Sequence, residues 1–189
     1  MGALDEGERV VAADASAWRA WLEEHHERIA GVWLLSVRGN RAGGVGYDDA
    51  VRQALCFGWI DGPVRTFDDT TVGQWFSPRR PSSGWAATNK ARLAELEAAG
   101  LIAPAGRRVI EIAKANGSWT MLDGPEAGLE PDEFAAALDA VPDARANWDA
   151  FPRSVKKLGL THIATAKRPE TRAARIAKIV ADAAEGRRP

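Results

Sequence analysis

The chain has 189 residues, of which 46% are hydrophobic and 27% charged, and a formal net charge of −1. This length and composition predict a globular protein of one domain, or one domain with a helical appendage, and exclude a disordered or collagen-like chain. The near-zero net charge gives no general attraction to nucleic acid. The chain contains eight tryptophans but a single tyrosine.

The first half of the chain alternates helical and strand patterns. Asp14 or Ser16 can cap a helix that runs to about residue 29, with an apolar stripe of Trp18, Trp21, Leu22, His25 and Ile29. Residues 32–37 form a β-rich run without alternation, which predicts a strand buried on both faces. Residues 47–55 predict a second helix, ended by a left-handed cap at Gly58. Residues 59–66 and 71–77 predict an antiparallel hairpin.

From Trp85 onward the pattern is almost wholly helical. Helices are expected over residues 85–99 and from Pro104 to just before Gly117, with a loop over residues 118–130. Prolines mark four further helix starts: Pro131, Pro142, Pro152 and Pro169. The fold class is therefore predicted to be α+β, with a small antiparallel sheet of about three strands among helices in the N-terminal half and a helical C-terminal half. We divide the chain at residue 100, into residues 1–100 and a helical region 101–189 packed on it, with one continuous domain as the alternative.

Several classes of site and location are disfavoured by what the sequence lacks. Cys56 is the only cysteine, so neither an intrachain disulfide nor a thiolate metal cluster can form. Asp5, Glu6 and Glu8 stand where a signal peptide would be basic and apolar, and the apolar runs are far shorter than a membrane span. We expect a cytoplasmic protein without a membrane span, metal or cofactor.

Three patterns that could carry catalysis or phosphate binding are weak. The glycine-rich residues 39–46 follow a strand but lack the Lys-Ser/Thr ending of a phosphate loop and the third glycine of a dinucleotide fingerprint. His25 and His26 are adjacent on a helix and point about 100° apart, so they cannot share an ion without other ligands. Cys56 lies between Leu55 and Phe57, as a buried thiol would. No catalytic motif is recognised, which favours a protein that is not an enzyme.

Residues 59–90 combine tryptophan with arginine and carry the candidate binding surface. Because side chains alternate along a strand, Trp59, Asp61, Pro63 and Arg65 are expected on one face. The candidate ligand- or partner-binding residues are Trp59, Asp61, Arg65, Trp75, Arg79, Arg80, Trp85, Asn89 and Lys90. Aromatic rings with arginine can stack on planar groups and bind phosphate or carboxylate, which favours an unknown protein or a small anionic ligand. In the alternative interpretation the tryptophans are core and Asp61 pairs with an arginine to brace the hairpin.

The C-terminal tail is the one strongly charged region. Residues 151–189 carry 10 basic and 3 acidic side chains, a net charge of +7. One side of the last helix collects Lys167, Arg168, Arg172, Arg175 and Lys178, beside an apolar stripe. This basic face could bind nucleic acid, an acidic protein or anionic lipid. Such faces are usually only solvated surface, which disfavours nucleic acid as a partner.

The sequence resembles the YdeI/OmpD-associated, or bacteriocin-protection, family over nearly its whole length from about Trp18. The matching segments are residues 31–34, 47–50, 54–62, 76–81 with Trp85 and Asn89, 101–106, 152–154 and 166–172. The strings Cys-Phe-Gly-Trp-Ile-Asp and Ala-Lys-Arg-Pro-Glu-Thr-Arg are the longest of these. The helix around residues 156–162 lacks an aromatic residue that many relatives carry.

The resemblance implies a role in bacterial envelope stress and in tolerance of bacteriocins or cationic peptides, and it brings no catalytic residues. The leading hypothesis is a non-enzymatic binding protein that uses the surface around residues 59–90. One alternative is a small-molecule-binding domain or an enzyme with Asp61 as acid or base. The other is nucleic-acid binding through the basic C-terminal helix.

Overall fold

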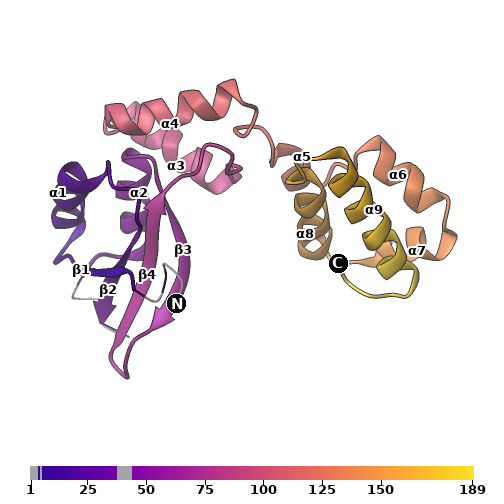
Figure 1. Cartoon of the computed structure of the whole chain (residues 1–189), viewed down its shortest axis with the longest axis horizontal. Helices are drawn as coiled ribbons and strands as arrows, with labels where there is room; N and C mark the ends of the chain where they lie inside the picture. The colour runs from indigo at the N-terminus through magenta and orange to yellow at the C-terminus, as the bar shows by residue number, and fades with distance from the viewer. Residues whose placement is uncertain (1–3, 5, 38–43) are drawn as a thin grey trace. The chain divides into compact units, whose positions relative to one another are not determined.

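The computed structural model describes Leu4, residues 6–37 and residues 44–189. Within it the chain forms two compact units. Unit 1 comprises residues 1–83 and 88–116, and unit 2 comprises residues 84–87 and 117–189. The boundary expected at residue 100 falls inside unit 1. Figure 1 shows the strands in the first part of the chain and helices alone in the second.

Unit 1 is built on a four-stranded sheet. Its strands are β1 (Glu8–Val11), β2 (Val32–Val37), β3 (Trp59–Thr66) and β4 (Thr71–Pro78), in the order β1-β2-β4-β3. β1 runs parallel to β2, while the β2–β4 and β3–β4 pairs are antiparallel. The α+β class and the β3–β4 hairpin are confirmed. β1 is an addition to the expected sheet, because its four residues are half polar and too short to give an alternating pattern.

Four helices accompany this sheet: α1 (Ala15–His25), α2 (Tyr47–Cys56), α3 (Ala87–Ala98) and α4 (Pro104–Ala115). The Asp14 side chain caps α1 by accepting the Ala17 N–H at 2.8 Å. α1 ends four residues before Ile29, which is fully exposed, so placing Ile29 in the apolar stripe was wrong. α1 packs on α2, and α2 packs on β3 and α4. Gly58 takes a φ of 76° just after α2, as the cap pattern predicted.

The core of unit 1 lies between α1, α2 and one face of the sheet. Trp18 is fully buried, stacks on Trp21 and contacts Phe76 of β4. Its indole N–H donates to the Ala50 carbonyl at 3.1 Å and so ties α1 to α2. This packing fixes the start of α2 against the sheet, where the candidate site lies.

Unit 2 consists of helices α5 (Asp123–Ala127), α6 (Asp132–Asp139), α7 (Pro142–Ala150), α8 (Arg153–Ala164) and α9 (Pro169–Ala184). α9 contacts α6, α7 and α8 (Figure 1). Its core is Phe134, Leu138, Ala144, Trp148, Leu160, Ile163, Ile176, Ile179, Val180 and Ala183.

The four proline-marked helix starts are confirmed within a residue. The loop expected over residues 118–130 contains the short helix α5. The sequence Asp123-Gly124-Pro125 is typical of a turn, so no helix was expected there. In the described part of the chain, no helix is long and apolar enough to cross a bilayer.

Candidate functional site

A cavity of about 480 Å³ opens in unit 1 between the start of α2 and strands β2, β3 and β4. Its polar lining is Ser36, Tyr47, Asp61 and Gln74, and its apolar walls include Leu34 and Val72. Cavities of roughly 300–1,000 Å³ with a few converging polar groups are the usual size for small-molecule sites. We therefore take this cavity as the candidate site.

A hydrogen bond between Tyr47 and Asp61 forms part of the cavity wall. The Tyr47 hydroxyl, at the first residue of α2, donates to Asp61 Oδ2 on β3 at 2.8 Å. Desolvation raises the pKa of Tyr47, and the hydrogen bond to Asp61 raises it further. The phenol therefore stays protonated at neutral pH and remains a donor.

A β-bulge decides which side of the sheet Asp61 occupies. The β3–β4 register pairs Asp61 with Phe76 but Val64 with Gln74, so β3 has one residue more than β4 over this stretch. Asp61 therefore lies on the sheet face that meets α2, whereas Arg65, paired with Gly73, lies on the opposite face. The expectation that Trp59, Asp61, Pro63 and Arg65 share one face is wrong, because the bulge between Asp61 and Val64 reverses the alternation.

Gln74 compensates for the bulge. Its side-chain amide donates to the Gly62 carbonyl at 2.6 Å, replacing a partner that the interrupted ladder does not supply. This contact fixes the Gln74 side chain beside Asp61 along the cavity lining. Both polar groups are thus held by neighbouring elements before any ligand arrives.

Arg79 places a positive charge close to Asp61. It is only 6% exposed, and its backbone N–H donates to the Gly58 carbonyl at 3.0 Å. Burial lowers the pKa of Arg79 to about 10, and attraction to Asp61 opposes that shift. Arg80, the next residue, is exposed. The two arginines therefore do not form one surface, and Arg79 is the one shown to be coupled electrostatically to Asp61.

The three candidate tryptophans are buried. Trp59 is fully buried, and its indole N–H donates to the His26 carbonyl at 3.0 Å. Trp75 is 8% exposed and packs edge-on against Trp33. Trp85 belongs to unit 2, where its ring lies 5.1 Å from Trp119. Their burial agrees with the alternative interpretation of the sequence, in which the tryptophans are interior residues and not a binding surface.

Asn89 and Lys90 lie at the start of α3, outside the cavity lining. Asn89 is buried, and its side-chain oxygen accepts from Arg92 at 2.9 Å. Arg92 also pairs with Asp48 of α2 at 2.8 Å. Asn89 therefore braces α3 against α2 through Arg92.

On the opposite face of the sheet, Arg65 belongs to a cluster that the sequence pattern did not reveal. The guanidinium carbons of Arg9 and Arg65 lie 4.4 and 5.3 Å from the centre of the Phe67 ring. The ring lies over Gly73, where a Cβ would come within 2.6 Å of it. Arg9, Arg65 and Phe67 come from β1, β3 and the hairpin turn, so only the sheet order brings them together.

Comparison with known families divides the chain close to its structural division. A family model described as "Domain of unknown function (DUF8412)" matches residues 10–109, more than half of the 189 residues. A second, described as "Bacteriocin-protection, YdeI or OmpD-Associated" (OmdA), matches residues 130–186. The chain belongs to the DUF8412 family and carries an OmdA domain. No curated protein and no solved structure matches it.

The resemblance to the YdeI/OmpD-associated family is thus confirmed in the C-terminal part, including the Ala-Lys-Arg-Pro-Glu-Thr-Arg string. The Cys-Phe-Gly-Trp-Ile-Asp string lies instead within the DUF8412 match, as does every residue of the cavity. The cavity is therefore a feature of the DUF8412 region, and the basic C-terminal face is a feature of the OmdA region.

Within the OmdA region, the five basic residues of α9 and its approach have different surroundings. Arg172 pairs with Glu133, Arg175 donates to the His162 carbonyl, and Lys178 pairs with Asp182. Lys167 and Arg168 are exposed and have no ion-pair partner among the described residues. The face is therefore not a uniform row of available charges.

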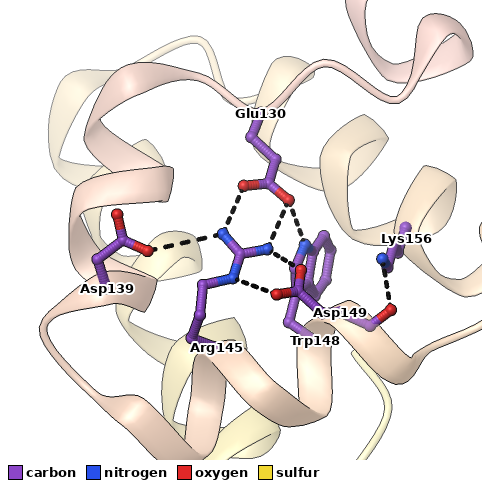
Figure 2. A network of polar contacts seen from close by, with 6 residues as sticks. All are labelled: Glu130, Asp139, Arg145, Trp148, Asp149 and Lys156. Carbon is purple, nitrogen blue, oxygen red and sulfur yellow. Dashed lines mark hydrogen bonds and ion pairs between the residues drawn. The ribbon is translucent and has the colours of Figure 1, made fainter.

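A charged network in the OmdA region, which the sequence analysis did not single out, surrounds Arg145 (Figure 2). Arg145 binds both oxygens of Glu130, at 2.8 and 3.0 Å, and also pairs with Asp149. Glu130 also accepts the Trp148 indole N–H at 2.7 Å. Hydrogen bonds from Arg145 hold the pKa of Glu130 below its usual value. Because these groups bind one another, the network braces α7 against the segment before α6.

The described residues contain no group of three His, Cys, Asp or Glu side chains placed to hold a metal ion. Cys56 is buried, and desolvation raises the pKa of its thiol, which disfavours the nucleophilic thiolate. The glycine-rich segment is described only from Gly44 onward, so most of it lies outside the described residues.

Proposed function

We propose that the DUF8412 region binds a small cationic ligand, bearing an amine or guanidinium group, in the cavity beside Tyr47 and Asp61. The observation that carries this proposal is a partly exposed carboxylate in the wall of a 480 Å³ cavity. The chain acts here as a binding protein, with Asp61 as the anchoring residue. This develops the small-molecule alternative of the sequence analysis, without an acid–base step.

The chemistry of the cavity wall supports a cation. A carboxylate has about four acceptor positions, and the Tyr47 hydroxyl occupies one of them. Arg79 is enclosed within unit 1, whereas Asp61 is partly exposed at the cavity. A ligand cation can therefore approach Asp61 from solvent and form charge-assisted hydrogen bonds, which are about twice as strong as neutral ones.

The proposal bears on the function that the family description suggests. The OmdA model is described by bacteriocin protection, and the resemblance implies tolerance of cationic peptides and a role in envelope stress. Amine and guanidinium groups are the charged groups of such peptides, so a cavity with the Asp61 carboxylate in its wall suits a fragment of one. The stress role stays a prediction.

A second candidate is an anionic partner on the opposite face of the sheet, the remaining form of the tryptophan–arginine hypothesis. Arg9 and Arg65 are exposed, and each is held on the Phe67 ring. Arginines oriented in this way can bind phosphate or carboxylate bidentately. This face would serve a binding event separate from the cavity.

Isothermal titration calorimetry of the full chain with agmatine, which carries both an amine and a guanidinium, tests the main proposal. We expect binding that Asp61→Asn weakens by about tenfold to a hundredfold, the cost of losing hydrogen bonds to a charged group. Asp69→Asn is the matched control, because it removes the same charge from an exposed turn residue outside the cavity.

Thermal melts of both variants establish that they are folded. Absence of agmatine binding, or equal affinity in wild type and Asp61→Asn, would refute the cavity proposal. A parallel titration with inorganic phosphate addresses the second candidate. Phosphate binding that Arg65→Ala removes and Asp61→Asn leaves intact would support that face as an anion site, and its absence would count against it.

A further inference from the structure

A second hollow, of about 930 Å³, lies in unit 2 between α6 and α9. Its floor is apolar and includes Ala137, Ile176 and Val180, of which Ile176 and Val180 also belong to the core. We call this hollow the α6–α9 groove. It shares no residue with the cavity of unit 1, so it requires an explanation of its own.

Along this groove, a row of exposed side chains on α9 is small and uncharged. Ala173, Ala177 and Ala181 follow one another at four-residue steps, line the groove and are exposed. Residues four apart lie on the same side of a helix, so these methyl groups form one continuous strip. A strip without long side chains lets the backbone of another helix approach closely.

The groove has a charge at one end only. Its lining includes three cations and one carboxylate: Lys167, Arg168, Arg172 and Glu133. Arg172 and Glu133 pair with each other, which leaves Lys167 and Arg168 uncompensated among the described residues. Both stand at the N-terminus of α9, where the helix dipole adds further positive potential. The far end, near Val141 and Ala184, has no charged lining residue.

We infer that the α6–α9 groove binds an amphipathic helix of a partner protein, with its apolar face on the alanine strip and its carboxylates beside Lys167 and Arg168. Recognition of this kind uses apolar residues at helical spacing as anchors. α9 has 16 residues and spans about 24 Å, so it can accept a partner helix of about four turns.

The same observations disfavour nucleic acid at this face. A phosphate backbone would require a row of available cations, but Arg172, Arg175 and Lys178 are bound to Glu133, His162 and Asp182 within unit 2. The apolar strip between the ends offers phosphates no partner. An acidic amphipathic helix uses both the strip and the two uncompensated cations.

Fluorescence anisotropy tests the inference with a labelled 16-residue peptide, leucines on one helical face and glutamates in its first two turns. The charge-reversed peptide, with lysine for glutamate, is the comparison. We expect the full chain to bind the acidic peptide at least tenfold more tightly than the basic one. Ala177→Glu should abolish that binding, and the double variant Lys167→Glu/Arg168→Glu should weaken it at least tenfold.

Ala174→Glu is the matched control, because Ala174 is exposed on the same helix but lies outside the groove lining. It should bind the peptide like the wild type, and thermal melts should show all variants folded. The inference fails if the acidic peptide does not bind, or if charge reversal of the peptide leaves the affinity unchanged. It fails as well if Ala177→Glu and Ala174→Glu weaken binding equally. It also fails if sedimentation velocity shows a dimer that Ala177→Glu dissociates, since the groove would then hold a second copy.

Discussion

The cavity of unit 1 and the α6–α9 groove of unit 2 differ in how they use charge. In the cavity of unit 1 a carboxylate stands in the wall, fixed by Tyr47 and close to the buried Arg79. In the α6–α9 groove the walls are mostly apolar, Arg172 and Glu133 pair with each other, and the uncompensated charge among the described residues is that of Lys167 and Arg168 at one end. The first arrangement suits a small polar molecule, and the second suits an extended amphipathic one.

The difference follows from how each unit satisfies its polar groups. Unit 1 uses a bulged sheet, which directs Asp61 and Gln74 toward a hollow. In unit 2 the main polar network is closed on itself, because Arg145, Glu130 and Trp148 bind one another. The side of α9 that lines the groove carries small apolar side chains, and Lys167 and Arg168 precede it without an ion-pair partner among the described residues.

The largest expected effect comes from removing the residue that links the polar network to the core of unit 2. Trp148 is fully buried, packs edge-on against Phe134 at 4.9 Å and donates to Glu130. We expect Trp148→Ala to lower the free energy of unfolding of unit 2 by about 3–5 kcal/mol. Hydrogen exchange read by mass spectrometry should show faster exchange in α6, α7 and α9.

Leu158→Ala is the control for this variant, because Leu158 lies in the same unit and is 60% exposed. A surface change of this kind should alter stability by less than about 0.5 kcal/mol. If Trp148→Ala accelerated exchange in β2 and β4 as much as in α7, the contrast between the units would be contradicted.

A smaller effect is expected from Glu130→Gln, which keeps the shape of the side chain but removes its charge. The variant should cost about 1–3 kcal/mol at neutral pH, because it weakens the paired hydrogen bonds with Arg145. The folded-state pKa of Glu130 lies below the ordinary value of 4.5. Its charge therefore stabilises the fold fully above that value and progressively less as the pH falls through the folded-state pKa.

Urea unfolding of wild type and Glu130→Gln between pH 7 and pH 3 checks this prediction. The stability difference between the two should shrink as the pH falls. A difference that stayed constant would mean that the Glu130 charge does not stabilise the folded state. Glu185→Gln provides the comparison, because Glu185 is exposed and outside the network.

The sequence predicted most elements because their boundaries carry local signals. Pro104, Pro142 and Pro169 each begin a helix, and Gly58 and Gly100 end helices with positive φ. β1 was missed because its hydrogen-bonding partner is distant in the chain and only one of its residues is buried. Local pattern therefore gave helices and the hairpin, but not the order of the sheet.

The candidate site was predicted only in part, for a similar reason. Asp61 was selected, but the one-face interpretation of β3 could not allow for an extra residue at Gly62-Pro63. Tyr47 was included only as the first residue of the helix predicted over residues 47–55. Nothing local in the sequence indicates that its hydroxyl meets Asp61, which lies 14 residues further along the chain. The tryptophans were chosen as candidates because they are numerous, whereas the cavity is lined by residues whose frequency in the sequence is ordinary.

The smallest expected effect is also the most direct test of the cavity wall, because Tyr47 is the single tyrosine of the chain. Its ionisation can be followed by ultraviolet difference absorbance without assigning signals among several tyrosines. Desolvation and the hydrogen bond to Asp61 both raise its pKa, so the wild type should titrate above the ordinary value of 10.0. Asp61→Asn should lower that pKa, because it removes the negative charge that opposes formation of the phenolate.

Asp69→Asn should leave the Tyr47 titration unchanged, because Asp69 lies outside the cavity lining. Agmatine should lower the Tyr47 pKa in the wild type, since a cation bound to Asp61 offsets the carboxylate charge that disfavours the phenolate. It should have no such effect on Asp61→Asn. If neither the substitution nor agmatine changed the Tyr47 pKa, the hydrogen bond between Tyr47 and Asp61 would be contradicted. The cavity would then lack the fixed carboxylate that distinguishes it from the α6–α9 groove.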